Sequence, residues 1–455
     1  MADQSVESLM ALAVGLVERA RQGGADVAEV VARAGSELSV RVRLGETELV
    51  EEAGHRAVGM RVMKGKRVAL TSTSDLTATG LDRFIADALE LADLSQEDPF
   101  AGPADPQELA QGPFADLSLF DPAMGELDAA QAIAMARKAE DAARKADPRI
   151  TNSEGATVSR TAGSVALALS SGFRGGYRGS FASVHVVPLA EDEGGKKRRG
   201  SYYSAKRFLE DLEDAEEVGK EAARRTLRKL GPRKVATCEA PVVFDREAAR
   251  SIIGSFAGCA TGGAIWRKSS YLAGREGTEV ASPLITLVDD PHLVRGPGSR
   301  PFDGEGLKSR KNTLVERGVL KMYLCDSYSG RKLGRPSTAN ASRGGGGGVG
   351  ISTTNFICQA GDSTSEAIIA KTERGLYVTE MMGFGFNAIT GDFSRGAAGF
   401  WIENGELTYP VSEVTISLNL DQLLKRIDLV GNDLDWKSSV VAPTFRVSSM
   451  TIAGT

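Results

Sequence analysis

The feature that most limits the fold of this 455-residue chain is the series of short strand-like runs and turns from residue 233 to the end. Asn404-Gly405 lies between Phe400-Trp401-Ile402 and Leu407-Thr408-Tyr409, and this dipeptide between β-forming residues is typical of a two-residue hairpin turn. Arg317-Gly318 has a similar position between two apolar runs. Further strand-like runs occur at residues 284–288, 376–378, 414–418 and 445–452. Residues 233–455 are therefore predicted to form a large, mainly antiparallel β-rich C-terminal domain.

The first 232 residues are predicted to form an α/β region in two parts, so that the whole chain has an α+β fold. In residues 1–95, apolar side chains at helical spacing end at Gly23-Gly24, strands follow with a hairpin at Lys64-Gly65-Lys66, and a second helix begins near Leu81. Residues 96–126 contain five of the sixteen prolines and are predicted to be a Pro-rich linker. Residues 127–232 are predicted to be a second α+β subdomain, with a charged helix at about 211–230.

The N-terminus and the cysteines indicate a cytoplasmic protein. The first twenty residues lack a basic start, and Glu7, Glu18 and Arg19 bound the apolar stretch, which is unlike a signal peptide. No window approaches 18 uninterrupted apolar residues, so no membrane span is expected. The four cysteines are too sparse for a disulfide framework or a zinc ribbon and are expected to be reduced.

The charge balance excludes a strongly basic nucleic-acid-binding protein. Lys and Arg number 55 against 60 Asp and Glu, which gives a net charge of −5. No nucleic-acid partner and no membrane partner are expected.

Local metal-binding motifs are absent from the sequence. Of the three histidines, His55, His185 and His292, no two lie one helical turn apart. Asp289-Asp290-Pro291-His292 is the densest group of possible ligands, and a turn after a strand explains it more simply.

Two further motifs carry weaker signals. The five consecutive glycines from Gly344 to Gly348 resemble an anion-binding loop, but the Walker pattern is absent and a mobile loop is favoured. Ser329 and Lys332 match Ser-x-x-Lys, which places a hydroxyl and an amine one helical turn apart, without the companion motifs of Ser-Lys acyl enzymes.

Long ordered stretches in the C-terminal half carry a family resemblance. They are Gly263-Ala-Ile-Trp-Arg-Lys-Ser-Ser270, Ser299-Arg-Pro-Phe-Asp303, Tyr328-Ser-Gly-Arg-Lys-Leu-Gly334, Thr379-Glu-Met-Met-Gly383 and the run from Ala388 to Gly405. With these residues the chain resembles the TldD/PmbA family of peptidases, and within it the PmbA (TldE) branch. The resemblance implies a zinc-bearing TldD-type subunit with a HExxxH helix and a later cysteine, paired with a PmbA-type subunit. Together the two cleave short or unfolded peptides.

The resemblance also implies that this chain binds no metal and that its partner holds the zinc. The comparable helix reads Arg246-Glu-Ala-Ala-Arg-Ser251, so on this register Arg246 and Ser251 replace both His while Glu247 remains as the one weak catalytic candidate. A guanidinium has no lone pair to donate to a metal ion. The tail 434–443 has no cysteine.

Three functions follow from these observations. The first is a non-metal-binding subunit of a heteromeric zinc peptidase, whose β domain lines a chamber and binds peptide as an added strand. Its candidate cleft or interface residues are Asp392, Arg395, Trp266 and Trp401, with a structural turn or core packing as the alternative for each. The second is a stand-alone hydrolase that uses Ser329 and Lys332 or a cysteine, and the third is a non-catalytic peptide-binding module.

Overall fold

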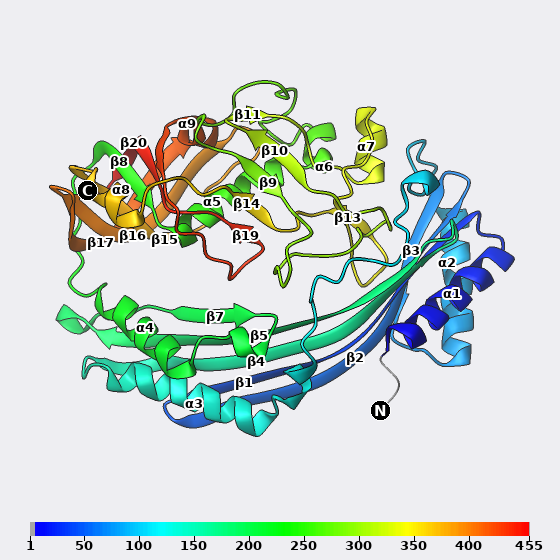
Figure 1. Ribbon diagram of the computed structural model, residues 1–455, viewed down its shortest axis with the longest axis horizontal. Helices are drawn as coiled ribbons and strands as arrows, with labels where there is room; N and C mark the ends of the chain where they lie inside the picture. The colour runs from blue at the N-terminus through cyan, green and yellow to red at the C-terminus, as the bar shows by residue number, and fades with distance from the viewer. Residues whose placement is uncertain (1–4, 455) are drawn as a thin grey trace.

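The computed structural model describes residues 5–454, and its N-terminal part is built around one long curved sheet (Figure 1). The elements of this part are α1 (Val6–Gln22), β1 (Val27–Arg43), β2 (Glu46–Lys64), β3 (Arg67–Thr73), α2 (Ala78–Leu94), α3 (Ala129–Lys145), β4 (Ile150–Leu169), β5 (Arg174–Glu191), β6 (Lys197–Arg199), β7 (Tyr202–Lys206) and α4 (Ala215–Leu227). The strand order is β3-β2-β1-β4-β5-β6, and β7 pairs with β5. Helices α1 and α2 cover one end of the sheet, and α3 and α4 cover the other.

The helix end and the hairpin that the sequence predicts in residues 1–95 are both present in the structure. Helix α1 ends at Gln22 with Gly23 as its cap, and β2 and β3 form a hairpin in which Lys64 pairs with Arg67. Strand β1 pairs along most of its length with β4, from Glu29 opposite Leu169 onwards. The strands of residues 1–95 and 127–232 therefore lie in a single sheet.

The C-terminal part contains the strands β8 to β20. Its elements are β8 (Cys238–Phe244), α5 (Arg246–Cys259), α6 (Gly262–Trp266), β9 (Leu287–Asp289), β10 (Asn312–Glu316), β11 (Val319–Leu320), α7 (Ser327–Leu333), β12 (Ala341–Arg343), β13 (Val349–Ile351), β14 (Phe356–Cys358), α8 (Ser365–Ala370), β15 (Arg374–Met382), β16 (Asp392–Glu403), β17 (Glu406–Asn419), α9 (Leu420–Lys425), β18 (Ile427–Val430), β19 (Val440–Val441) and β20 (Phe445–Ala453). The predicted α+β class, with a β-rich C-terminal region, is confirmed.

Five of these strands close into a ring. Strand β17 pairs with β16, β16 with β15, β15 with β8, β8 with β20, and β20 with β17 again. The apolar face of α5, with Ile252, Ile253 and Phe256 fully buried, belongs to the same hydrophobic core as these strands. This packing fixes the start of α5 at the end of β8.

The hairpin turns at Arg317-Gly318 and Asn404-Gly405 are confirmed, because Glu316 pairs with Val319 and Glu403 with Glu406. The strand expected at 284–288 begins only at Leu287. The Ile285 N–H donates to the Ser282 carbonyl in a turn, and Leu284 is 53% exposed, so the segment cannot extend earlier.

The five-glycine loop joins β12 to β13 and lies against β2. A methyl group built on Gly59 of β2 would stand 2.3 Å from the Gly345 carbonyl oxygen and 2.4 Å from the Gly347 nitrogen. Only hydrogen on Gly59 permits this backbone-to-backbone approach. The sequence favours a mobile loop here, whereas the structure has a hairpin tip docked on the N-terminal sheet.

A buried ion network stands beside this contact. The carboxylate of Glu29 accepts hydrogen bonds from Arg343 at 2.5 Å and from Arg61 at 3.2 Å, and all three side chains are less than a tenth exposed. Glu29 and Arg61 come from the N-terminal sheet, and Arg343 comes from β12. The two parts of the chain are therefore joined by a buried charge pair as well as by the loop.

No helix in the described residues 5–454 combines the length and the apolar character needed to cross a membrane.

Candidate functional site

The start of α5 faces the end of α4 across the boundary between the two parts of the chain. Asp245 caps α5 by accepting the Ala248 N–H at 2.8 Å. Glu247, in the first turn, accepts a hydrogen bond from Arg225 of α4 at 2.7 Å. Arg225 also donates to Glu221 at 2.8 Å and lies 4.5 Å from the centre of the Tyr202 ring. Glu247 is thus held by an arginine from the other part of the chain.

The end of α4 carries two more cations on the same face. Arg225, Arg228 and Lys229 follow the i, i+3, i+4 spacing that brings helical side chains together. Lys229 donates to Glu380 of β15 at 2.7 Å, and the Arg228 guanidinium lies 4.3 Å from the centre of the Phe400 ring of β16. These side chains line a cavity of about 540 Å³ between α4 and the C-terminal part, which we call the interdomain cavity.

The protonation of two acids in this cavity departs from the ordinary values. Burial raises the pKa of the Asp245 carboxyl to about 7. Burial acts in the same direction on Glu221, but hydrogen bonds from Arg224 and Arg225 outweigh it and lower the pKa of Glu221 to about 2. The cavity therefore combines a fixed carboxylate with one that is easily protonated.

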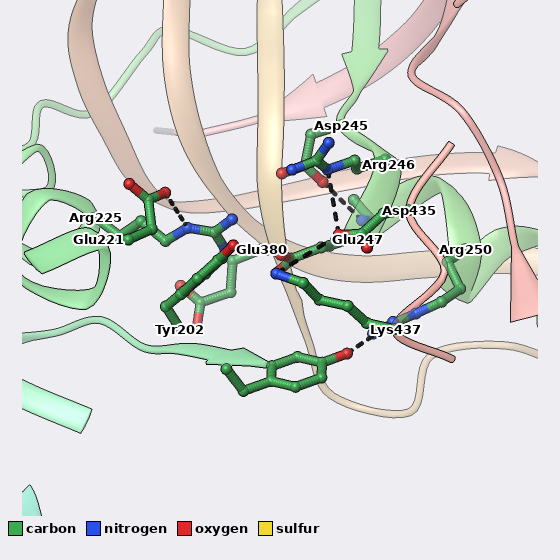
Figure 2. A network of polar contacts seen from close by, with 12 residues as sticks. Tyr202, Glu221, Arg225, Asp245, Arg246, Glu247, Arg250, Glu380, Asp435 and Lys437 are labelled. Atoms are coloured by element: carbon green, nitrogen blue, oxygen red, sulfur yellow. Dashed lines mark hydrogen bonds and ion pairs between the residues drawn. The ribbon is translucent and has the colours of Figure 1, made fainter. Parts of the chain in front are cut away.

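A second group of charges joins α5 to the tail of the chain (Figure 2). The Arg246 side chain lies 3.6 Å from Asp435, and the Lys437 ammonium lies 3.9 Å from the same carboxylate and 3.2 Å from Glu213. Lys437 is 8% exposed and sits 3.7 Å from the centre of the Tyr202 ring. Burial lowers the pKa of this ammonium group.

Ser251, one turn and a half into α5, is held by Arg395. The Arg395 Nη1 donates to the Ser251 Oγ at 2.9 Å. Asp392 lies three residues earlier on the opposite face of β16, is exposed, and accepts hydrogen bonds from Thr390 and Asn419. The structure therefore brings Arg395, but not Asp392, to the helix that carries Glu247.

These side chains do not fit a zinc ion. Zinc in proteins takes imidazole, thiolate or carboxylate ligands. At α5 and the tail the chain offers guanidinium groups, a hydroxyl and an ammonium. The carboxylates there are already paired, Glu247 with Arg225 and Asp435 with Arg246 and Lys437. Within residues 5–454, no group of three or more His, Cys, Asp or Glu side chains is arranged to hold a metal ion.

The two candidate tryptophans have different surroundings. Trp401 is 2% exposed in the hydrophobic core and offers no surface to a partner. Trp266 is partly exposed at the end of α6, with its ring 6.0 Å from that of Tyr328.

Ser329 and Lys332 take different partners. The Ser329 Oγ donates to Asp326 at 2.6 Å and is almost fully buried. The Lys332 ammonium lies over the rings of Phe100, Trp266 and Tyr328, at 4.1 Å, 5.0 Å and 5.4 Å from their centres. The amine is therefore committed to an aromatic pocket and not to the hydroxyl.

Three of the four cysteines are buried and are poor nucleophiles in these positions. Burial raises the pKa of Cys259 and Cys325 to about 11 and that of Cys358 to about 12. The reactive thiolate is accordingly suppressed at neutral pH.

Comparison with known proteins decides the family. Three family models match in order: PmbA/TldA metallopeptidase domain 1 over residues 28–92, the central domain over 123–230 and the C-terminal domain over 237–454. The chain belongs to the PmbA/TldD family. Metalloprotease PmbA from Escherichia coli O157:H7 is 39% identical over 95% of this chain and 93% of its own length. The PmbA homologue from Haemophilus influenzae is 36% identical over 96% of this chain and 94% of its own length.

Solved structures agree with this placement. A Bacteroides thetaiotaomicron protein described as a modulator of DNA gyrase superposes with a TM-score of 0.91 and 28% identity, over 98% of both chains. TldE from Thermococcus kodakarensis superposes with a TM-score of 0.82 over 97% of this chain and 99% of its own, and at 22% identity it supports the fold alone. The chain is a PmbA/TldD-family peptidase in sequence and in fold.

Sequence reasoning identified α5 of this PmbA/TldD-family chain but missed the residues that face it. Arg225, Arg228 and Lys229 lie in the charged helix that was predicted, and their spacing places them on one face. That spacing was the available signal, but it does not show which element the face meets. The contribution of Lys437 has no local signal, because Glu213 and Tyr202 lie far from it in the sequence.

Proposed function

We propose that this chain is the subunit of a PmbA/TldD-type peptidase that carries no catalytic zinc. It supports peptide binding and assembles with a zinc-bearing, TldD-type partner. The pair cleaves short or unfolded peptides, and the metal chemistry belongs to the partner.

The observation that carries this proposal is the state of the α5 side chains. Each position that would serve a metal ion in a HExxxH helix has another side-chain partner here. Arg246 lies beside Asp435. Glu247 accepts a hydrogen bond from Arg225, and Ser251 accepts one from Arg395. Two of these three partners are permanent cations, which repel a divalent metal ion. The names of the relatives, metalloprotease PmbA among them, support the reaction class.

The test compares the isolated chain with the mixed pair. The full chain is purified, its zinc content is measured by mass spectrometry, and hydrolysis of an unstructured decapeptide is followed with and without a chelator. The same measurements are made after mixing with a family member that contains HExxxH.

For the isolated chain we expect no stoichiometric zinc and no hydrolysis. For the mixture we expect a rate of hydrolysis that exceeds that of the partner alone and that a chelator abolishes. Stoichiometric zinc on the isolated chain would overturn the proposal. Chelator-resistant hydrolysis by the isolated chain would instead favour a stand-alone hydrolase that needs no metal.

A further inference from the structure

The four cations at the end of α4 are not equally compensated. Arg224 pairs with Glu221 at 2.6 Å. Arg225 has the carboxylates of Glu221 and Glu247 at 2.8 Å and 2.7 Å, and Lys229 has Glu380 at 2.7 Å. For Arg228 the contact is the ring of Phe400, at 4.3 Å, and among the described residues it has no carboxylate partner. On the α4 wall, Arg228 is therefore a cation without an ion-pair partner among the described residues.

Arg228 is also only partly hydrated. It is half-buried, and burial together with the neighbouring Arg224 lowers the pKa of its guanidinium. A cation in such a place gains more from a negatively charged ligand than one in bulk water, because the lower effective dielectric strengthens the attraction. Its planar fork of donors matches a carboxylate in two parallel hydrogen bonds.

The rest of the cavity suits a peptide. The side chains of Ser201, Thr379 and Asn432 line it and have no hydrogen-bond partner within residues 5–454. Neutral hydroxyl and amide groups of this kind pair with backbone N–H and C=O groups. The volume of about 540 Å³ falls in the usual range for a cavity that takes up a small ligand.

The surrounding acids decide between possible anions. Six carboxyl groups and five cationic side chains line the same cavity, so a doubly charged phosphate would add more uncompensated negative charge than a singly charged group would. A single carboxylate can pair with Arg228 and adds only one negative charge. The C-terminal end of a peptide carries a single negative charge, and its backbone N–H groups can donate hydrogen bonds to the acids of the cavity.

We propose that the interdomain cavity binds the C-terminal carboxylate of a peptide and that Arg228 pairs with it. The inference rests on the proposed peptide-binding function and specifies which end of the peptide this chain recognises.

The experiment uses two probes and the full chain. An unstructured hexapeptide with an N-terminal fluorophore is prepared with a free C-terminus and, separately, as the C-terminal amide, and binding is followed by fluorescence anisotropy. We expect the free acid to bind about 10-fold or more tightly than the amide, since a charge-assisted hydrogen bond contributes on the order of 1.5–3 kcal/mol.

Three variants assign the effect to Arg228. Arg228→Gln is expected to bind the acid and the amide equally, and Arg228→Lys is expected to keep part of the preference. Lys220→Gln removes one charge from an exposed position of the same helix and is expected to keep the full preference. Thermal melting of each variant verifies that the fold is retained.

The outcomes separate the inference from the proposed function. Equal affinity of the unmodified chain for acid and amide would overturn the inference and leave peptide binding intact. A preference that survives in Arg228→Gln would also overturn it. Absence of binding for both peptides would overturn the inference together with the peptide-binding role.

Discussion

The Nη1 of Arg395 lies 2.9 Å from the Oγ of Ser251, although 144 positions separate the two residues. On the register that the family resemblance implies, the permanent charge of Arg395 thus stands beside the position of the second histidine of HExxxH. Restoring the two imidazoles should therefore not be enough to create a metal site.

We predict that the double variant Arg246→His/Ser251→His takes up far less than one zinc ion per chain, as measured by mass spectrometry after dialysis. Arg395 repels the ion from one side, and Arg225 keeps Glu247 in a hydrogen bond at 2.7 Å on the other. Adding Arg395→Ala is expected to raise the zinc content. A full equivalent of zinc on the double variant would contradict this account of the site.

The contact between Arg225 and Glu247 predicts a stability effect. Arg225→Ala leaves the partly buried Glu247 without its charged donor and Glu221 with Arg224 alone, and we expect it to lower the free energy of unfolding by about 1–3 kcal/mol. Glu247→Gln keeps an acceptor for Arg225 and should cost about 1 kcal/mol or less. Urea denaturation gives both values, and an equal loss for the two variants would show that the charge on Glu247 matters more than its accepted hydrogen bond.

The docking of the five-glycine loop predicts a sharp difference between two glycines of β2. Gly59→Ala would force a methyl group to 2.3 Å from the Gly345 carbonyl oxygen, and we expect a loss of about 1–3 kcal/mol from overpacking. Gly54→Ala is the matched control, since its nearest atom would stand at 3.8 Å. Thermal melting compares the two. If Gly59→Ala and Gly54→Ala have the same melting temperature, the five-glycine loop does not contact β2 in solution.

Glu305 predicts a pH dependence of stability. Burial, with a further contribution from the charge of Asp303, raises the pKa of Glu305 from its ordinary 4.5 to about 7. The folded state therefore holds this proton more tightly than the unfolded state, so the contribution is complete below about pH 4.5 and is lost as the pH rises through about 7. The total is on the order of 3 kcal/mol.

Urea denaturation at a series of pH values tests this prediction. Glu305→Gln, which can still accept the Ser327 N–H, should lose less stability than the unmodified chain between about pH 4.5 and pH 7. Asp303, whose pKa burial also raises, keeps part of the slope in both proteins. An identical slope in the variant would mean that Glu305 is ionised throughout.

The parts of the fold that depend on local signals could be predicted from the sequence. The end of helix α1 at Gly23-Gly24 and the hairpin turn at Asn404-Gly405 each involve residues within a few positions of one another. The types of these residues favour the backbone conformation that each feature requires. The pairing of β1 with β4 and the docking of the five-glycine loop on Gly59 join segments more than a hundred positions apart. No local pattern specifies such partners.

The candidate site shows the same division. Glu247 and its helix could be identified from the sequence, because residues 246–251 align with the HExxxH motif of the family that the chain resembles. The partners that determine the chemistry of this helix, Arg225, Arg395 and Asp435, come from three other segments. The sequence gives their identities but not the geometry that makes Arg225 and Arg395 neighbours of one helix.

The pairing of Glu29 with Arg343 has a consequence for how the protein is made. The two residues are 314 positions apart, so the ribosome releases the strand that bears Glu29 long before the arginine that completes its charge balance. Until then Arg61 is the one of these two arginines beside that carboxylate, and the five-glycine loop does not yet cover the backbone of Gly59 and Met60. About the first three quarters of translation therefore yield an unfinished surface, and a gene fragment that stops before codon 343 would leave that surface exposed.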